Sequence, residues 1–402
     1  MEMDNFENVS PFDAFKLVIK VLIWTGIYEV NTQRKTIRTA HYVYRILVIF
    51  IAVLSLTQHG IRMYQMRDVR EELFLALIKG IPVFTLIIKE INIFRYILRI
   101  NKLHEQIKDS KCMPSNEKDA DYLLKNNKFM YTLTKISMLM MFVGFSSFVV
   151  FMFIRRYLDP KVQLPSYMPF STDSMVGFCV AIILDLIIGT WTGFGQYASD
   201  LVIATYYAHA TVQLKILKYN LISVFGVDKV ESNMTIIGNH FQYKDVLDPN
   251  LKQRFGYYAE KYRMLICFVQ DVDAIFNWHM SIQFFTASAN LCFVSSIFST
   301  VKILSSDFVF STIVALLSAS QVFLYCYFGH QVRYESESMN TAIYSSDWMS
   351  VSPSLRRDVF TAMTAWHRPI SSQVSYIVPV SLVTFVSIMR FAYSLYTLMK
   401  AV

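Results

Sequence analysis

Residues 130–154 decide the class of fold, and they read MYTLTKISMLMMFVGFSSFVVFMFI. Lys135 is the one charged side chain among them. A helix of about 20 mostly apolar residues crosses the hydrocarbon core of a bilayer, about 30 Å. Working outward in both directions, the sequence predicts seven such spans, near residues 42–61, 73–98, 130–154, 175–198, 276–300, 307–329 and 376–399.

The composition agrees with an all-α integral membrane protein of several spans. Of the 402 residues, 54% are hydrophobic and only 17% are charged, whereas soluble domains are about 25% charged. The net charge of +8 is also seen in proteins that bind nucleic acid. In a membrane protein such an excess more often records basic cytoplasmic loops, so we expect no nucleic-acid partner.

The first residues lack the basic and apolar regions of a cleaved signal peptide, so we expect the first span to insert the chain. Residues 12–28 form a shorter apolar stretch that carries Lys16 and Lys20, which predicts an amphipathic helix lying at the membrane interface. None of the five cysteines has CxxC spacing. We therefore expect no metal site and no cofactor. None of the cysteines lies in a segment expected to be extracellular, so no disulfide is expected.

The distribution of positive charge predicts the orientation. If the N-terminus is cytoplasmic, 24 Lys and Arg lie in cytoplasmic segments and 8 lie outside. Cytoplasmic loops carry the excess of Lys and Arg, so the N-terminus is expected inside and the C-terminus outside. This topology is the reverse of that of a G-protein-coupled receptor.

The apolar pattern continues past the inner face of the membrane. Helical spacing of apolar residues extends through 201–216, 255–266 and 332–343, and a short helix is expected over 354–366, between two prolines. Four such helices can pack into a bundle that suits oligomerisation. The alternative is that each is a solvated or membrane-surface extension.

These patterns divide the chain into six parts. They are a cytoplasmic segment with the interfacial helix (1–41), spans one to four (42–198), extensions of spans four and five (199–275), spans five and six (276–329), cytoplasmic anchor helices (330–368) and the last span (369–402).

The last span differs from the others because serine and threonine recur along it. Such residues serve helix packing or face water in a pore. One span cannot enclose a pore, so the second interpretation requires several subunits around a symmetry axis.

The C-terminal quarter resembles the insect odorant receptor family. The residues that carry the resemblance are Gly329, Ser338, Ala342, Tyr344, Trp348, Pro369, 379–385, 390–394, Thr397 and Leu398. The family often has glycine where Ser375 stands. Insect gustatory receptors are related but end in a Gln-Phe pattern that is missing from residues 398–402. The odorant co-receptor has a longer loop between spans four and five than residues 218–252, which favours a ligand-tuning subunit.

The resemblance implies an odorant-gated, non-selective cation channel in the plasma membrane of olfactory sensory neurons. It implies a tetramer with the odorant co-receptor, surrounded by membrane lipid. The anchor region, with most of the subunit contact, would include Tyr344, Trp348, Pro353 and Trp366. The last span would line the pore for permeating cations, with a hydrophobic gate near its outer end at Leu398 and Val402 and polar neighbours at Ser394 and Thr397.

Members of this family bind odorant in the outer half of the membrane, between spans two, three, four and six. By position, the residues implied are Leu77, Ile81, Phe84, Phe145, Phe148, Val149, Met152, Val180, Ile183, Ile187, Phe310, Ile313 and Leu317. An apolar, aromatic-lined cavity suits a small volatile molecule. No charged residue dominates this set, so a neutral ligand is expected.

Four ionisable residues inside the predicted spans are functional candidates, namely Lys79, Lys89, Asp185 and Arg390. Asp185 can pair with Lys79 or with Lys135, and the spacing does not choose between them. Arg390 can face the inner vestibule or contact a neighbouring subunit.

Other functions remain as alternatives: a chemoreceptor that signals through a G protein, a gustatory-type channel, or a secondary transporter. A transporter should show paired broken helices in two halves, and no internal repeat is seen. The eight histidines are scattered and form no catalytic motif, so an enzyme is not expected.

Overall fold

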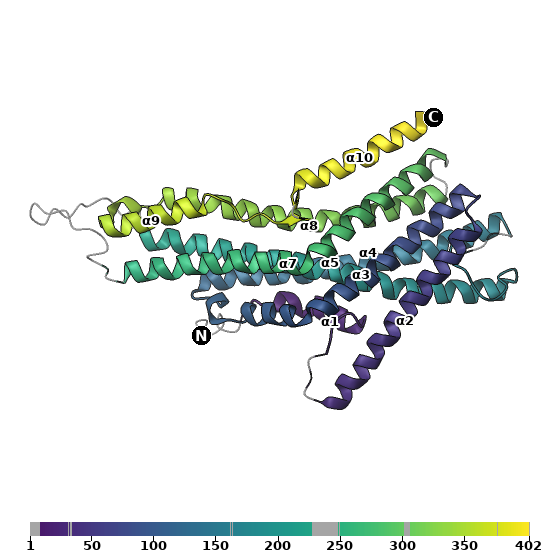
Figure 1. Ribbon diagram of the computed structural model, residues 1–402, viewed down its shortest axis with the longest axis horizontal. Helices are drawn as coiled ribbons and strands as arrows, with labels where there is room; N and C mark the ends of the chain where they lie inside the picture. Colours follow the sequence, from purple (N-terminus) through teal and green to yellow (C-terminus); the bar gives the residue numbers. More distant parts are fainter. Residues whose placement is uncertain are drawn as a thin grey trace, which may run out of the picture.

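The computed structural model describes residues 9–30, 32, 34–160, 162, 164–226, 248, 250–300, 306–375 and 377–401. Long helices run along one axis of an elongated molecule (Figure 1). The helices are α1 (Asp13–Trp24), α2 (Lys35–Gln65), α3 (Arg70–Ile107), α4 (Glu117–Leu158), α5 (Met175–Phe225), α7 (Leu251–Thr300), α8 (Ser306–Tyr344), α9 (Pro353–Trp366) and α10 (Leu382–Ala401), with short 3-10 turns at Ser110–Cys112 and Trp348–Ser350.

Five helices of the described part are long and apolar enough to cross a membrane by themselves: α2, α4, α5, α7 and α8. The other two predicted spans lie in α3 and α10. Helix α3 is long enough but less apolar, because it carries several charges, among them Lys79, Lys89 and Glu90. Helix α10 is apolar but shorter. The predicted class, a nearly all-helical membrane protein, is confirmed.

The last helix begins later than the predicted residue 376. Strands β1 (Gln373–Val374) and β2 (Val378–Pro379) form an antiparallel pair just before it. Proline lacks an N–H group and disfavours helix at the residue before it, so Pro379 delays the helix. Ser381 then caps α10, because its Oγ accepts a hydrogen bond from the amide of Thr384 at 3.4 Å.

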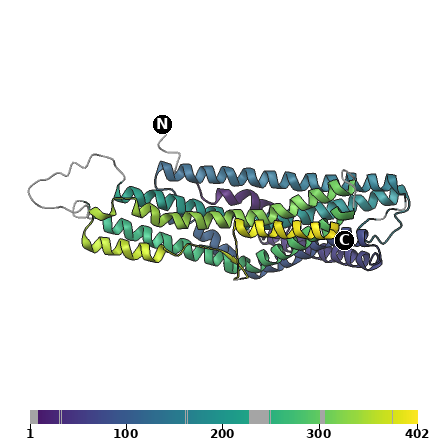
Figure 2. The same ribbon diagram turned by 90° about the horizontal axis from the view of Figure 1, so that it is seen from above.

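Helices α5, α7 and α8 continue well beyond a bilayer's thickness. At about 1.5 Å per residue, the 51 residues of α5 extend about 75 Å. The predicted stripe on its second half is buried, from Leu201 to Ile216. Helix α9 lies at this end of the molecule, and the C-terminal end of α10 lies at the opposite end (Figures 1 and 2). The extensions of α5, α7 and α8 pack together with α9, and most of their buried apolar residues belong to one core cluster that continues into the predicted spans.

Helix α1 packs against protein helices on its apolar face. Phe15, Val18 and Leu22 are buried in the main core cluster, and the ring of Phe15 lies 5.0 Å from that of Tyr206 on α5. The amphipathic pattern of this helix is therefore used to cover α5, while Lys20 on its other face is exposed.

Candidate functional site

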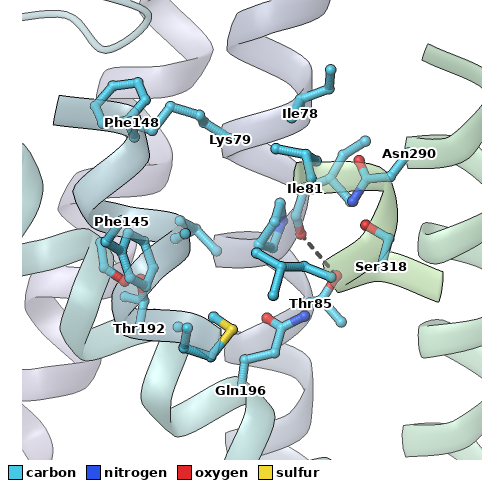
Figure 3. Close-up of a pocket in the computed structure, with 18 of the residues that line it drawn as sticks. Ile78, Lys79, Ile81, Thr85, Phe145, Phe148, Thr192, Gln196, Asn290 and Ser318 are labelled. Atoms are coloured by element: carbon cyan, nitrogen blue, oxygen red, sulfur yellow. Dashed lines mark hydrogen bonds between the residues drawn. The ribbon is translucent and has the colours of Figure 1, made fainter. Parts of the chain in front are cut away.

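A cavity of about 160 Å³ lies among helices α2, α3, α4, α5, α7 and α8. Figure 3 shows side chains of α3, α4, α5, α7 and α8 around it, among them Ile81, Phe145, Thr192 and Gln196. Its lining includes members of both large core clusters, such as Met141 of the first and Phe310 of the second. The cavity therefore separates two well-packed parts of the bundle.

Glycines on α5 make room for an aromatic wall. A Cβ atom on Gly193 would lie 2.4 Å from Cζ of Phe145, and one on Gly189 would lie 3.2 Å from the same ring. Any larger residue at position 193 would have to displace the ring. The Phe145 ring thus lies directly against the backbone of α5, and this contact helps to set the width of the cavity.

An ion pair forms part of the wall. The Nζ atom of Lys79 on α3 donates to Asp185 on α5, and it also lies 3.7 Å from the centre of the Phe148 ring. Ser166 Oγ donates to the other carboxylate oxygen at 3.4 Å. Of the two partners open to Asp185, the structure selects Lys79, since Lys135 is exposed on another face. The opposed charges compensate each other, which suits a neutral ligand.

Five of the thirteen sequence-predicted ligand residues line the cavity: Ile81, Phe145, Phe148, Phe310 and Leu317. Three on α5 are exposed on the outside of the bundle, namely Val180, Ile183 and Ile187, and so is Phe84 on α3. Met152 is fully buried in the second core cluster and Val149 packs against it. Leu77 and Ile313 are partly buried and lie outside the lining.

The polar part of the lining was not predicted from the sequence. Both faces of the first half of α5 are apolar, so periodicity could not tell which one points inward. The inward face carries Gly189, Thr192, Gly193 and Gln196. The sequence did contain a signal for this face. Gly189, Gly193 and Gln196 are spaced by four and three residues, which places small and polar residues on one side of the helix.

A second buried charge cluster lies on the inner side of the cavity. The carboxylate of Asp200 on α5 accepts hydrogen bonds from Lys89 on α3 and Tyr325 on α8, and His279 Nε2 on α7 lies 3.2 Å away. These four side chains are completely buried. Asp200, His279 and Tyr325 each lie four residues from a glutamine of the cavity lining, so the cluster sits one helical turn below it.

Helix α10 has one packed face and one open face. Phe385 packs on Phe323 of α8, with ring centroids 5.4 Å apart, and Ser295 Oγ of α7 donates to the Ala392 carbonyl at 3.3 Å. On the opposite face an exposed stripe with helical spacing carries Ser387, Arg390, Ser394, Thr397 and Leu398. Three predicted pore residues, Ser394, Thr397 and Leu398, therefore lie together. The fourth, Val402, lies outside the described residues.

The predicted subunit-contact residues differ in their positions. Tyr344 is 73% exposed and Pro353 is exposed, so both are free to contact another chain. Trp348 is half-buried. Trp366 is buried in the subunit's own core, where its ring lies 4.7 Å from that of Tyr262.

Comparison with known proteins points to one family. Residues 70–393 match the family model described as 7tm Odorant receptor. Odorant receptor 47a of Drosophila melanogaster is 22% identical over 251 residues, which is 61% of this chain and 60% of that protein. Odorant receptor 2a of the same species is 34% identical over 79 residues, 20% of each chain. Both alignments span less than two thirds of the relative's length.

The whole fold also matches solved structures. The olfactory receptor OR5 from Machilis hrabei in complex with eugenol superposes with a TM-score of 0.77 at 12% identity, covering 97% of this chain and 98% of that one. A second structure of the same receptor gives a TM-score of 0.76, again at 12% identity, over 96% of this chain and 97% of that one. At this identity the match shows a shared fold.

Proposed function

The chain belongs to the insect odorant receptor family, and from that premise we propose that it is the odorant-binding subunit of a ligand-gated, non-selective cation channel. Members of this family are receptors and not enzymes. The observation that carries the proposal is the pairing of two features in one subunit. A cavity lies inside the helical bundle, and α10 presents an open stripe that includes the polar side chains of Ser387, Arg390, Ser394 and Thr397.

The stripe on α10 supports a role in lining a pore. Polar and charged side chains such as Ser387, Arg390 and Ser394 are costly when they face lipid. Water in a pore, or a neighbouring subunit, removes that cost. Because one helix cannot surround a pore, several subunits must place their α10 helices around a common axis. Leu398, exposed near the outer end of the stripe, suits a hydrophobic constriction.

The extension bundle supports assembly with the odorant co-receptor in a tetramer. Large apolar side chains are exposed near its end, among them Tyr344, Met349 and Phe360. A shallow groove bordered by Tyr344, Met363 and His367 lies beside them. Exposed apolar patches of this kind mark protein contacts. We infer that this surface, with Trp348 and Pro353 at its edge, meets the neighbouring subunits on the cytoplasmic side.

The orientation and the place of action follow from the same proposal. The segments on the same side of the membrane as the N-terminus carry most of the Lys and Arg. This excess favours a cytoplasmic N-terminus and an extracellular C-terminus. With that orientation the cavity lies among the membrane spans, outward of the extension bundle. A volatile ligand would reach it in an olfactory sensory neuron from the outside or through the lipid.

Cysteine accessibility tests the pore assignment directly. In cells that also express the co-receptor, with exposed Cys267 replaced by serine, Ser387→Cys and Ser394→Cys are treated with a charged thiol reagent during odorant application. We expect the current to fall. Ile388→Cys and Leu395→Cys lie on the less exposed side of α10 and serve as matched controls. Equal modification of both pairs, or of neither, would contradict a pore-lining stripe.

A further inference from the structure

Three glutamines from three different helices form a chain of amides on the inner side of the cavity. Gln283 Nε2 on α7 donates to Gln321 Oε1 on α8 at 2.8 Å, and Gln196 Nε2 on α5 donates to Gln283 Oε1 at 3.5 Å. All three side chains line the cavity. They are 6%, 2% and 8% exposed for Gln196, Gln283 and Gln321, respectively.

This chain of amides is left incomplete at its end. The Oε1 atom of Gln196 is buried and has no hydrogen-bond partner among the described residues. Turning all three amides round would move the unpaired oxygen from Gln196 to Gln321, because each amide has one acceptor end and one donor end. In either arrangement one end of the chain offers an acceptor and the other offers a donor. Higher on the wall, Asn290 Oδ1 is likewise buried and unpaired.

Much of the remaining polar lining is already satisfied. Thr85 donates to the Ile81 carbonyl at 2.8 Å and Thr192 to the Gly189 carbonyl at 3.0 Å. Lys79 and Asp185 are paired with each other. A buried acceptor without a donor is unfavourable. A molecule in the cavity that brings a donor to the glutamines therefore gains a hydrogen bond that an apolar molecule of the same shape cannot form.

The size of the cavity limits the rest of the molecule. A volume of about 160 Å³ is close to the roughly 150 Å³ of an apolar protein cavity that holds one benzene molecule. Aromatic and aliphatic side chains, including Phe145, Phe148 and Leu317, cover the other walls. The ligand should thus carry a single ring or a chain of similar volume.

We propose that the cavity selects small volatile alcohols or phenols of about one ring, whose hydroxyl group hydrogen-bonds to the amide chain of Gln196, Gln283 and Gln321. A hydroxyl suits either arrangement of the amides because it both donates and accepts. This inference rests on the proposed function, since it assumes that this cavity is the odorant site.

Isosteric pairs of compounds test the inference without any mutation. Phenol is compared with toluene, and cyclohexanol with methylcyclohexane, in cells that express this receptor together with the co-receptor. The hydroxyl compound of each pair should be at least about tenfold more potent, because a polar site discriminates strongly against analogues that leave it unpaired. Equal potency, or greater potency of the methyl compounds, overturns the inference while leaving the channel proposal intact.

A binding measurement separates the inference from gating. In the purified complex with the co-receptor, phenol and cyclohexanol should raise the unfolding temperature more than their methyl partners. Stabilisation by none of the four compounds overturns the inference. Failure of the channel proposal has a different signature, namely stabilisation by the hydroxyl compounds without any ligand-evoked ion current.

Variants locate the hydroxyl within the cavity. Gln196→Met and Gln321→Met keep the length of the side chain and remove one end of the amide chain, so each should reduce the preference for phenol over toluene severalfold. Thr192→Val is the matched control, because Thr192 lines the cavity with its hydroxyl already bonded to its own helix. An unchanged preference in both methionine variants, or an equal loss in the valine variant, contradicts the role assigned to the glutamines.

Discussion

Lys89 of α3 donates a hydrogen bond to Asp200 of α5 in the interior of the bundle, and both side chains are completely buried. Tyr325 of α8 and His279 of α7 complete the group, so one carboxylate joins four helices. The group lies one turn below the glutamines of the cavity. It fixes the mutual positions of the helices that carry the ligand site.

Removing the lysine should therefore destabilise the subunit strongly. Lys89→Met leaves Asp200 as an uncompensated buried charge, which costs about 3–5 kcal/mol. Thermal unfolding of the purified complex in detergent measures the loss. Lys111→Met is the control, because Lys111 and Glu260 form an exposed ion pair at 2.9 Å, and such pairs add little stability. Similar unfolding temperatures for the two variants would show that the buried pair is not a structural link.

The contact between Gly193 and Phe145 sets the width of the cavity. Gly193→Ala places a methyl group 2.4 Å from Cζ of Phe145, so the ring must shift within the cavity wall. We expect the potency of ring-sized odorants to fall by about tenfold or more, as overpacking costs about 1–3 kcal/mol. Dose–response currents measure the change. Gly60→Ala on α2 is the control, since a Cβ there meets nothing within 4 Å, and an equal loss in that variant would refute the assignment.

Leu398 is expected to hold the closed pore shut. Leu398→Asn introduces a polar side chain at the outer end of the α10 stripe, so water should enter more easily and resting current without odorant should rise. Whole-cell leak current, normalised to surface expression, measures this. Leu316→Asn tests specificity, because Leu316 is equally exposed, at 61% against 63% for Leu398, but lies on α8. A resting conductance equal to that of the unmodified channel would remove Leu398 from the gate.

The extension bundle should lose stability in mild acid. His104 and His209 lie beyond the predicted spans and are buried. Burial, with help from Lys108, lowers the pKa of His104 to about 4, and burial, with help from Lys261, lowers the pKa of His209 to about 3. The unfolded chain, with histidine pKa values near 6.5, then binds more protons than the folded one as pH falls below about 6.5.

The size of this effect follows from the same values. Between about pH 7.5 and pH 5.5 each histidine should cost the folded state about 1.3 kcal/mol, and the unfolding temperature should fall accordingly. His209→Phe preserves the aromatic contact with Phe268, whose ring centroid lies 5.5 Å away, and should make the pH dependence shallower. A pH dependence that is the same in this variant would mean that His209 is not neutral in the folded protein.

Periodicity predicted the helices well because burial repeats along them. The stripe from Leu201 to Ile216 and the short helix that ends near Trp366 both lie where the pattern places them. The break before the last helix follows from Pro379, which the prediction overlooked. At Ser375 the structure gives a physical reason for a feature of the family. Its φ of 52° lies in the left-handed region that favours glycine, the residue that the family often has at this position.

Pairings between distant helices could not be read from the sequence. The partner of Lys89 is Asp200, 111 residues away, and not Glu90, the acidic residue next to it along the chain. The cavity wall was predicted from apolar residues, and on α5 this selected Ile183 and Ile187 on the outer face. In a membrane helix both the lipid-facing side and the core-facing side are apolar. The polar and small residues, including Gln196 and Gly193, were the better guide to the inside.

The most direct test of ligand-gated ion conduction is a recording from excised inside-out patches that contain this chain and the co-receptor. The solutions contain no GTP or other nucleotide, and a single-ring alcohol is added to a patch with unequal sodium and potassium on its two sides. We predict channel openings that begin on ligand addition and reverse at a voltage that reflects permeation of both cations. Openings that require GTP, or that vanish when G proteins are blocked, would contradict the proposed channel.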